Sequence, residues 1–125
     1  MVRSGKVKVV SVVDDDASFR GALQRLLKSA GFQVRAFASA EDFLKSGRQH
    51  ETGCLIADIR MPGMSGLDLQ AKLNADHFPI PTIFISAHGD EKMRLQAMRG
   101  GAVKFLAKPF DDAILLESVR TALNR

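Results

Sequence analysis

The chain has 125 residues, of which 46% are hydrophobic and 26% charged, an ordinary composition for one globular, water-soluble domain and not for a disordered or fibrous chain. Because no apolar run approaches the roughly 20 residues of a membrane span and no signal-type segment opens the chain, we expect a cytoplasmic protein with no membrane contact. The net charge of +4 would permit nucleic-acid binding, but the basic residues are scattered and Trp and Tyr are absent, which favours a solvated surface.

Five apolar, strand-like runs alternate with segments of helical periodicity. The strand-like runs are 9–13, 32–37, 54–57, 82–85 and 102–107. The helical patterns cover 19–30, segments beginning near 39 and 65, about 90–99 and about 111–123. This alternation predicts the α/β class, with βα units on a parallel sheet, and a single domain over residues 1–125.

Turn and capping residues mark the expected ends of these elements. Gly31 and the pair Gly100 and Gly101 each follow a helical pattern, where a glycine commonly ends a helix. Ser39 and Ser65 precede helical patterns and are expected to cap them. A loop is expected around Gly53, just before the third strand.

Polar residues follow four of the predicted strands. They are Asp14, Asp15 and Asp16 after the first strand, Asp58 after the third, Ser86 after the fourth and Lys108 after the fifth. Open parallel sheets bind ligands at the carboxyl ends of their strands, so these side chains are expected to share one site. Carboxylates held close together repel one another unless one is protonated or a cation lies between them, and oxygen ligands suit Mg²⁺. The pattern predicts a magnesium site for phosphate chemistry.

The residue types also suggest a role for each group. Asp58 stands alone at the end of an apolar strand and is the best candidate nucleophile, able to form an aspartyl phosphate. Asp14 and Asp15 are adjacent and better arranged to hold the metal. Lys108 and the hydroxyl of Ser86 can each bind a phosphoryl oxygen.

Four motifs extend over nearly the whole chain. They are VVDDD at 12–16, ADIRMPGMSG at 57–66, ISAH at 85–88 and FLAKPF at 105–110. In this order they resemble the receiver domains of two-component response regulators, although each motif alone is weak. The resemblance implies a flavodoxin-like (βα)5 fold whose parallel five-stranded sheet has the order 2-1-3-4-5.

The resemblance also implies a mechanism. Mg²⁺ would be bound by Asp14, Asp15, Asp58 and the backbone carbonyl of Arg60. Asp58 would accept a phosphoryl group from a phosphohistidine of a sensor histidine kinase. The chain would then be a signalling switch and not an enzyme acting on small substrates, although it would catalyse its own phosphorylation and dephosphorylation.

A switch and an output are implied as well. Ser86 and Phe105 match the family's switch pair, which reshapes the face formed by the fourth helix, the fifth strand and the fifth helix. The bond between Lys108 and Pro109 resembles the family's cis peptide. The motifs most resemble receivers that precede a helix-turn-helix module, so DNA binding would require a C-terminal domain. Exposed residues of the fourth helix are expected to support a homodimer on phosphorylation; they are Lys92, Met93, Arg94 and Gln96.

The same residues also permit other interpretations. The acids at 14–16 could simply cap a helix, and Asp16 is expected to do so. An aspartyl-phosphate hydrolase would need a further acid/base group that the motifs do not supply, and a receiver that only docks would not need the full set of polar residues. Cys54 is expected to be a small core residue. The three histidines lack zinc-ligand spacing. Four methionines are expected to serve packing: Met61, Met64, Met93 and Met98.

Overall fold

A computed structural model describes residues 8–87 and 91–124. Strands and α-helices alternate along them, and a short 3-10 turn, η1, precedes the third strand. The elements are β1 (Val9–Val13), α1 (Ala17–Ser29), β2 (Val34–Phe37), α2 (Ala40–Ser46), η1 (Arg48–Glu51), β3 (Thr52–Asp58), α3 (Gly66–Ala75), β4 (Thr82–Ser86), α4 (Glu91–Arg99), β5 (Lys104–Ala107) and α5 (Asp112–Leu123). The predicted α/β alternation is therefore confirmed.

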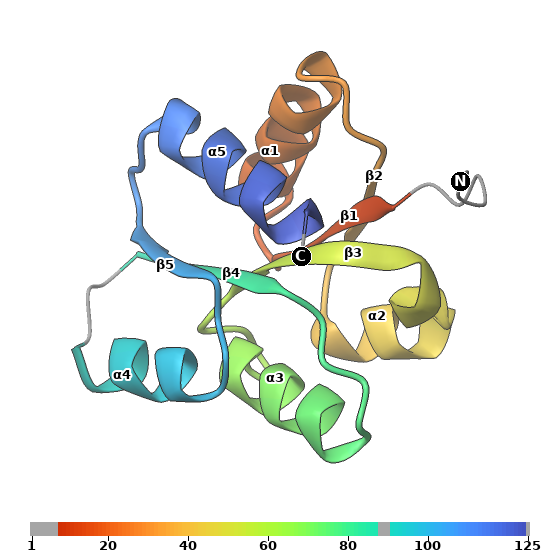
Figure 1. Cartoon of the computed structure of the whole chain (residues 1–125), viewed down its shortest axis with the longest axis vertical. Helices are drawn as coiled ribbons and strands as arrows, with labels where there is room; N and C mark the ends of the chain where they lie inside the picture. Colours follow the sequence, from red (N-terminus) through yellow and green to blue (C-terminus); the bar gives the residue numbers. More distant parts are fainter. Residues whose placement is uncertain (1–7, 88–90, 125) are drawn as a thin grey trace.

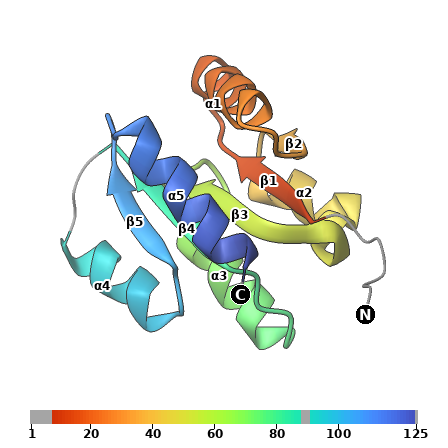
Figure 2. The same ribbon diagram turned by 45° about the horizontal axis from the view of Figure 1, so that its top comes forward.

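The strands form one parallel sheet in the order β2-β1-β3-β4-β5, as the resemblance implied. Helices α1 and α5 lie on one side of the sheet, and α2, α3 and α4 lie on the other (Figure 1). Figure 2 shows α5 running across β3 and β4. Because helices cover both faces of the sheet, β1 is buried along its whole length. Its one polar side chain, Ser11, shares a 2.7 Å hydrogen bond with the Thr52 hydroxyl.

The core consists of one cluster on each side of the sheet. Leu27 of α1 and Leu115 of α5 pack in the first cluster, and both are completely buried. Phe43 of α2 and Leu69 of α3 are completely buried in the second. Cys54 faces the first cluster and is also completely buried, as expected of a small core residue. No helix within the described residues has the length and apolar character of a membrane span.

Side-chain caps begin three helices where the sequence predicted them. Ser39 accepts a hydrogen bond from the amide of Asp42, at 3.0 Å. Ser65 and Asp68 form a reciprocal capping box at the start of α3. Asp16 caps α1, as expected. Each cap satisfies a backbone N–H group that has no partner inside its helix.

Two strands begin later than the sequence predicted, for one shared reason. The amide of Phe32 donates to the carbonyl of Leu27, and the amide of Ala102 donates to the carbonyl of Ala97, both at 3.1 Å. These bonds close the ends of α1 and α4 around glycines with positive φ, so the residues expected to open β2 and β5 instead complete the preceding helices.

The prediction of a loop around Gly53 was wrong. Gly53 lies inside β3, where Val9 pairs with Thr52 while Val10 pairs with Cys54, so the pairing register shifts at the glycine. A β-carbon at this position would lie within 3.0 Å of neighbouring side chains. The glycine therefore allows a close approach in an irregular strand and does not make a turn.

Two expectations about α4 are also corrected. Met93, which was expected both to serve packing and to lie on the exposed face, is half-buried and packs against the core, because it lies one turn before the buried Ala97 on the same helix face. The packing expectation is confirmed and the exposed one is wrong. Met98 is 39% exposed and does not serve packing as expected. The other α4 residues expected on the outer face are exposed: Lys92, Arg94 and Gln96.

Candidate functional site

The strand register brings the predicted site residues to one edge of the sheet. Val13 pairs with Ala57, so Asp14 follows β1 beside the end of β3, where Asp58 lies. Ser86 ends β4 and pairs with Ala107, so Lys108 follows β5 at the same edge.

Lys108 bridges two acids from different strands. Its Nζ lies 3.3 Å from Oδ2 of Asp58 and 3.4 Å from Oδ2 of Asp14. The Lys108 amide donates to the carbonyl of Ser86 at 2.8 Å, and the bond from Lys108 to Pro109 is cis, as expected. One ammonium thus faces two carboxylates, which leaves this group of three with one excess negative charge.

An aromatic side chain that the sequence reading missed contacts the same ammonium. Nζ of Lys108 lies 4.0 Å from the ring centroid of Phe19, which is a cation–π contact. Phe110 packs edge-on against that ring with centroids 6.0 Å apart. Phe19 opens the predicted helical pattern 19–30, and its contact with the lysine that follows β5 depends on how α1 sits on the sheet.

Asp14 is the most buried acid of the site, with its side chain 3% exposed. Burial raises the pKa of its carboxyl group above the ordinary value, and the nearby Asp58 carboxylate also raises it. The amide of Asp16, which donates to Asp14 Oδ1 at 2.9 Å, and the Lys108 ammonium oppose that rise in pKa. Arg20, also missed from the sequence, donates to the Asp14 carbonyl at 2.7 Å and fixes the end of β1.

Three carboxylates form a cluster that could hold a metal ion. Asp14, Asp15 and Asp58 each offer an oxygen, and these oxygens lie within 4.8 Å of one another. Asp14 is buried, Asp58 half-buried and Asp15 exposed, so the cluster opens to solvent on one side. Hard oxygen donors, an excess negative charge and an open side fit Mg²⁺, which keeps several water ligands.

The loop that follows β3 is anchored beside the acids. The amide of Arg60 donates to Asp58 Oδ1 at 3.1 Å, and the amide of Gly66 donates to the Ile59 carbonyl at 3.0 Å. A β-carbon on Gly66 would collide with the Asp58 carbonyl. The loop therefore begins and ends in close contact with the end of β3.

The two residues of the expected switch pair lie on neighbouring strands. Phe84 pairs with Phe105, and Ser86 lies two residues further along β4. Because alternate residues of a strand share a face, Ser86 and Phe105 lie on the same side of the sheet. Ser86 is 1% exposed, whereas Phe105 is half-buried against the core cluster of α2, α3 and α4.

Comparison with known proteins gives one consistent result. Residues 10–120 match the family described as "Response regulator receiver domain". Nodulation protein W of Bradyrhizobium diazoefficiens is 49% identical over 94% of this chain and 52% of its own length. The transcriptional regulatory protein FixJ of Azorhizobium caulinodans is 44% identical over 93% of this chain and 55% of its own length.

A solved structure agrees with the sequence relatives. The crystal structure of FixJ-N has a TM-score of 0.86 and 38% identity, and the match covers 94% of each chain. The present chain spans about half the length of the two relatives named above. The chain belongs to the response-regulator receiver family, whose members accept a phosphoryl group in two-component signalling.

Proposed function

We propose that Asp58 is the phosphoryl acceptor and that a phosphohistidine of a sensor histidine kinase is the donor. The observation that carries this assignment is the position of Asp58 at the end of β3, half-buried, with Oδ2 facing Lys108 and Oδ1 accepting the Arg60 amide. Asp14 is more deeply buried and Asp15 is exposed, which suits them better to hold a metal.

The proposed reaction is a direct transfer of the phosphoryl group from nitrogen to oxygen. A carboxylate oxygen of Asp58 attacks the phosphorus atom, the P–N bond breaks, and its electron pair returns to the donor imidazole. Lys108 then moves its ammonium from the carboxylate to a phosphoryl oxygen, and the Ser86 hydroxyl donates to another.

The acidic cluster would bind Mg²⁺ through Asp14, Asp15, Asp58 and the backbone carbonyl of Arg60. When bound, the ion would neutralise negative charge on the phosphoryl oxygens. Without a cation the cluster has an excess negative charge next to the position where a further anion must arrive. The fit between donor types and excess charge supports this choice of metal.

Phosphorylation would be communicated through Ser86 and Phe105. Drawing the buried hydroxyl toward the phosphoryl group would free space on the face that Phe105 shares, and the half-buried ring would turn inward. The surface formed by α4, β5 and α5 would then change shape. Exposed apolar side chains on α4 and α5 support its use as a homodimer contact on phosphorylation; they are Leu95, Met98 and Ile114.

The wider setting follows from the relatives. FixJ is named a transcriptional regulatory protein, and we propose that this receiver controls a helix-turn-helix output domain in the cytoplasm. DNA contact would belong to that domain. On this view the receiver is a switch that catalyses its own phosphorylation and dephosphorylation.

Intact mass spectrometry after incubation with acetyl phosphate and Mg²⁺ tests the proposal. Wild type should gain one phosphoryl group in a Mg²⁺-dependent manner, and Asp58→Asn should gain none. Asp76→Asn, which changes an exposed acid of the surface pair with Lys72, should behave as wild type. Phosphorylation of Asp58→Asn to the wild-type extent would reject the acceptor. Unchanged elution of the phosphorylated protein in gel filtration would reject the homodimer.

A further inference from the structure

Glu41 connects α2 to the loop that follows β3. Its Oε2 accepts a hydrogen bond from the amide of Met64 at 2.9 Å, although the two residues are 23 positions apart. Glu41 lies in the first turn of α2, on the same side of the sheet as α3 and outside the acidic cluster. This contact joins the start of α2 to the loop between β3 and α3.

The loop is shaped to receive this carboxylate. Gly63 has a φ of +76°, a conformation that favours glycine, and a β-carbon there would lie 2.6 Å from Glu41 Oε2. The carboxylate therefore occupies space that a side chain at position 63 would fill. The Met64 hydrogen bond is the largest cause of a lowered pKa for Glu41, which agrees with a carboxylate that is ionised in this contact.

The Glu41 contact is the far anchor of a loop whose near anchors lie at the site. At its base, the Ile59 amide donates to the Ile85 carbonyl at 3.1 Å, and the Gly66 amide donates back to the Ile59 carbonyl. Arg60 lies between these base contacts and the contact of Glu41 with Met64. The path of the chain through Arg60 is therefore set from both sides.

We propose that Glu41 is a positioning residue for the metal site. By holding Met64 it fixes the path of residues 60–64, and with it the direction of the Arg60 carbonyl relative to the acidic cluster. The inference rests on the proposed role of that carbonyl as a Mg²⁺ ligand. Glu41 touches neither the metal nor the phosphoryl group, so its removal weakens Mg²⁺ binding without removing a ligand.

Two measurements on the whole chain test this inference. Hydrogen exchange of the 59–65 segment without metal reports the anchoring, and calorimetric titration with Mg²⁺ reports affinity. In Glu41→Ala we expect faster exchange at Met64 and about tenfold weaker Mg²⁺ binding, the scale of effect seen when a metal ligand loses its support. Because Glu41→Gln keeps an acceptor oxygen at the same reach, it should restore most of both properties.

Two further variants separate positioning from general stability. Gly63→Ala attacks the same contact from the loop side, because its methyl group would displace the Glu41 carboxylate and its positive φ would strain an alanine, so it should weaken Mg²⁺ binding at least as much as Glu41→Ala does. Glu51→Ala removes an exposed glutamate from an unrelated ion cluster and should leave Mg²⁺ affinity unchanged. Urea unfolding in metal-free buffer should give similar midpoints for wild type and Glu41→Ala.

The outcomes distinguish this inference from the proposed function. Unchanged exchange in Glu41→Ala would show that the contact does not hold the loop, and faster exchange with unchanged Mg²⁺ affinity would reduce Glu41 to a structural role. Either result overturns the inference while the phosphoryl acceptor stands. A wild-type protein that binds no Mg²⁺ would overturn the proposed metal site and this inference with it.

Discussion

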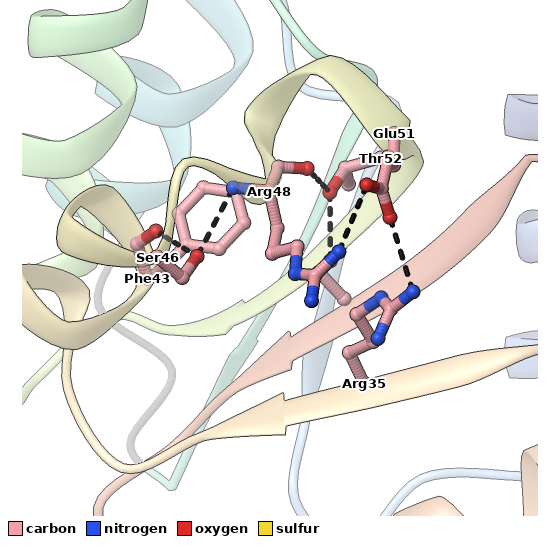
Figure 3. A network of polar contacts seen from close by, with 7 residues as sticks. Arg35, Phe43, Ser46, Arg48, Glu51 and Thr52 are labelled. Atoms are coloured by element: carbon pink, nitrogen blue, oxygen red, sulfur yellow. Dashed lines mark hydrogen bonds and ion pairs between the residues drawn. The ribbon is translucent and has the colours of Figure 1, made fainter.

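Two ion clusters in this molecule have opposite compositions. The buried triad consists of Asp14, Asp58 and Lys108. The surface triad consists of Arg35, Arg48 and Glu51. In the buried triad one cation faces two acids, at 3.3 and 3.4 Å. In the surface triad one acid faces two cations, at 2.9 and 3.1 Å (Figure 3).

The ion pairs of the surface triad are shorter than those of the buried triad, but we expect them to contribute less to stability. Side chains of the surface triad are 40–44% exposed, so water solvates and screens their charges. Those of the buried triad are 3–20% exposed, so both attraction and repulsion there are stronger. Distance alone is thus a poor guide to the energy of an ion pair. The excess charge of the buried triad persists as repulsion that a cation or a proton can relieve.

The largest expected effect comes from removing the shared cation. Lys108→Met keeps an unbranched side chain of similar length but leaves two acids without their cation, and we expect it to lower the free energy of unfolding by about 2 kcal/mol in metal-free buffer. Urea unfolding followed by circular dichroism measures this loss. Lys104→Met, which changes an exposed lysine at the start of β5, is the matched control. Equal midpoints for Lys108→Met and wild type would contradict the importance of the buried triad.

Substitution of Asp14 is expected to stabilise the protein, by less than the loss of Lys108 destabilises it. Asp14→Asn keeps an oxygen to accept the Asp16 amide and removes one of two repelling charges, so it should raise the free energy of unfolding by about 1 kcal/mol at neutral pH without metal. Asp42→Asn, at an exposed position of α2, serves as the control. A loss of stability in Asp14→Asn would mean that attraction to Lys108 outweighs burial and repulsion.

The pH dependence gives an independent check of the same residue. Because the folded protein raises the pKa of Asp14, the native state holds this proton more tightly than the unfolded chain does. The contribution of Asp14 to stability is therefore complete below its ordinary pKa and is lost as pH rises through the raised value. The advantage of Asp14→Asn over wild type should accordingly disappear in acid, and a constant advantage would contradict this origin.

The smallest effect is expected in the surface triad. Arg48→Ala and Glu51→Gln each break ion pairs that water already screens, so their urea midpoints should match wild type within error. The backbone carbonyl of Arg48, which accepts from the Thr52 hydroxyl, remains in both variants. A midpoint shift as large as that of Lys108→Met would abolish the contrast between the two triads.

Much of the fold could be predicted because its signals are local. Apolar runs, serine caps and terminal glycines depend on neighbouring residues, and they located each strand and helix. The errors arose where a residue serves two elements: Phe32 and Ala102 close helices instead of opening strands, and Gly53 permits close approach inside β3. Such uses depend on three-dimensional neighbours that a linear pattern does not contain.

The residues of the candidate site also fall into those that the sequence predicted and those that it did not. Its acids and its lysine were found because each follows a strand, and parallel strands bring those positions to one edge. Phe19, Arg20 and Glu41 were missed because they lie on helices, where their residue types fit ordinary helical positions. Only the placement of α1 and α2 on the sheet brings Phe19 to Lys108, Arg20 to the Asp14 carbonyl and Glu41 to the loop after β3.

The one thiol of the chain has a practical consequence. Cys54 is completely buried in β3, four residues before Asp58, and burial raises the pKa of its thiol to about 12. Thiolate is the reactive form, so oxidants and alkylating reagents have almost no target while the sheet is intact. The thiol is thereby protected from oxidation in the folded state. The rate at which this cysteine is labelled under native conditions therefore reports how often β3 separates from its neighbours.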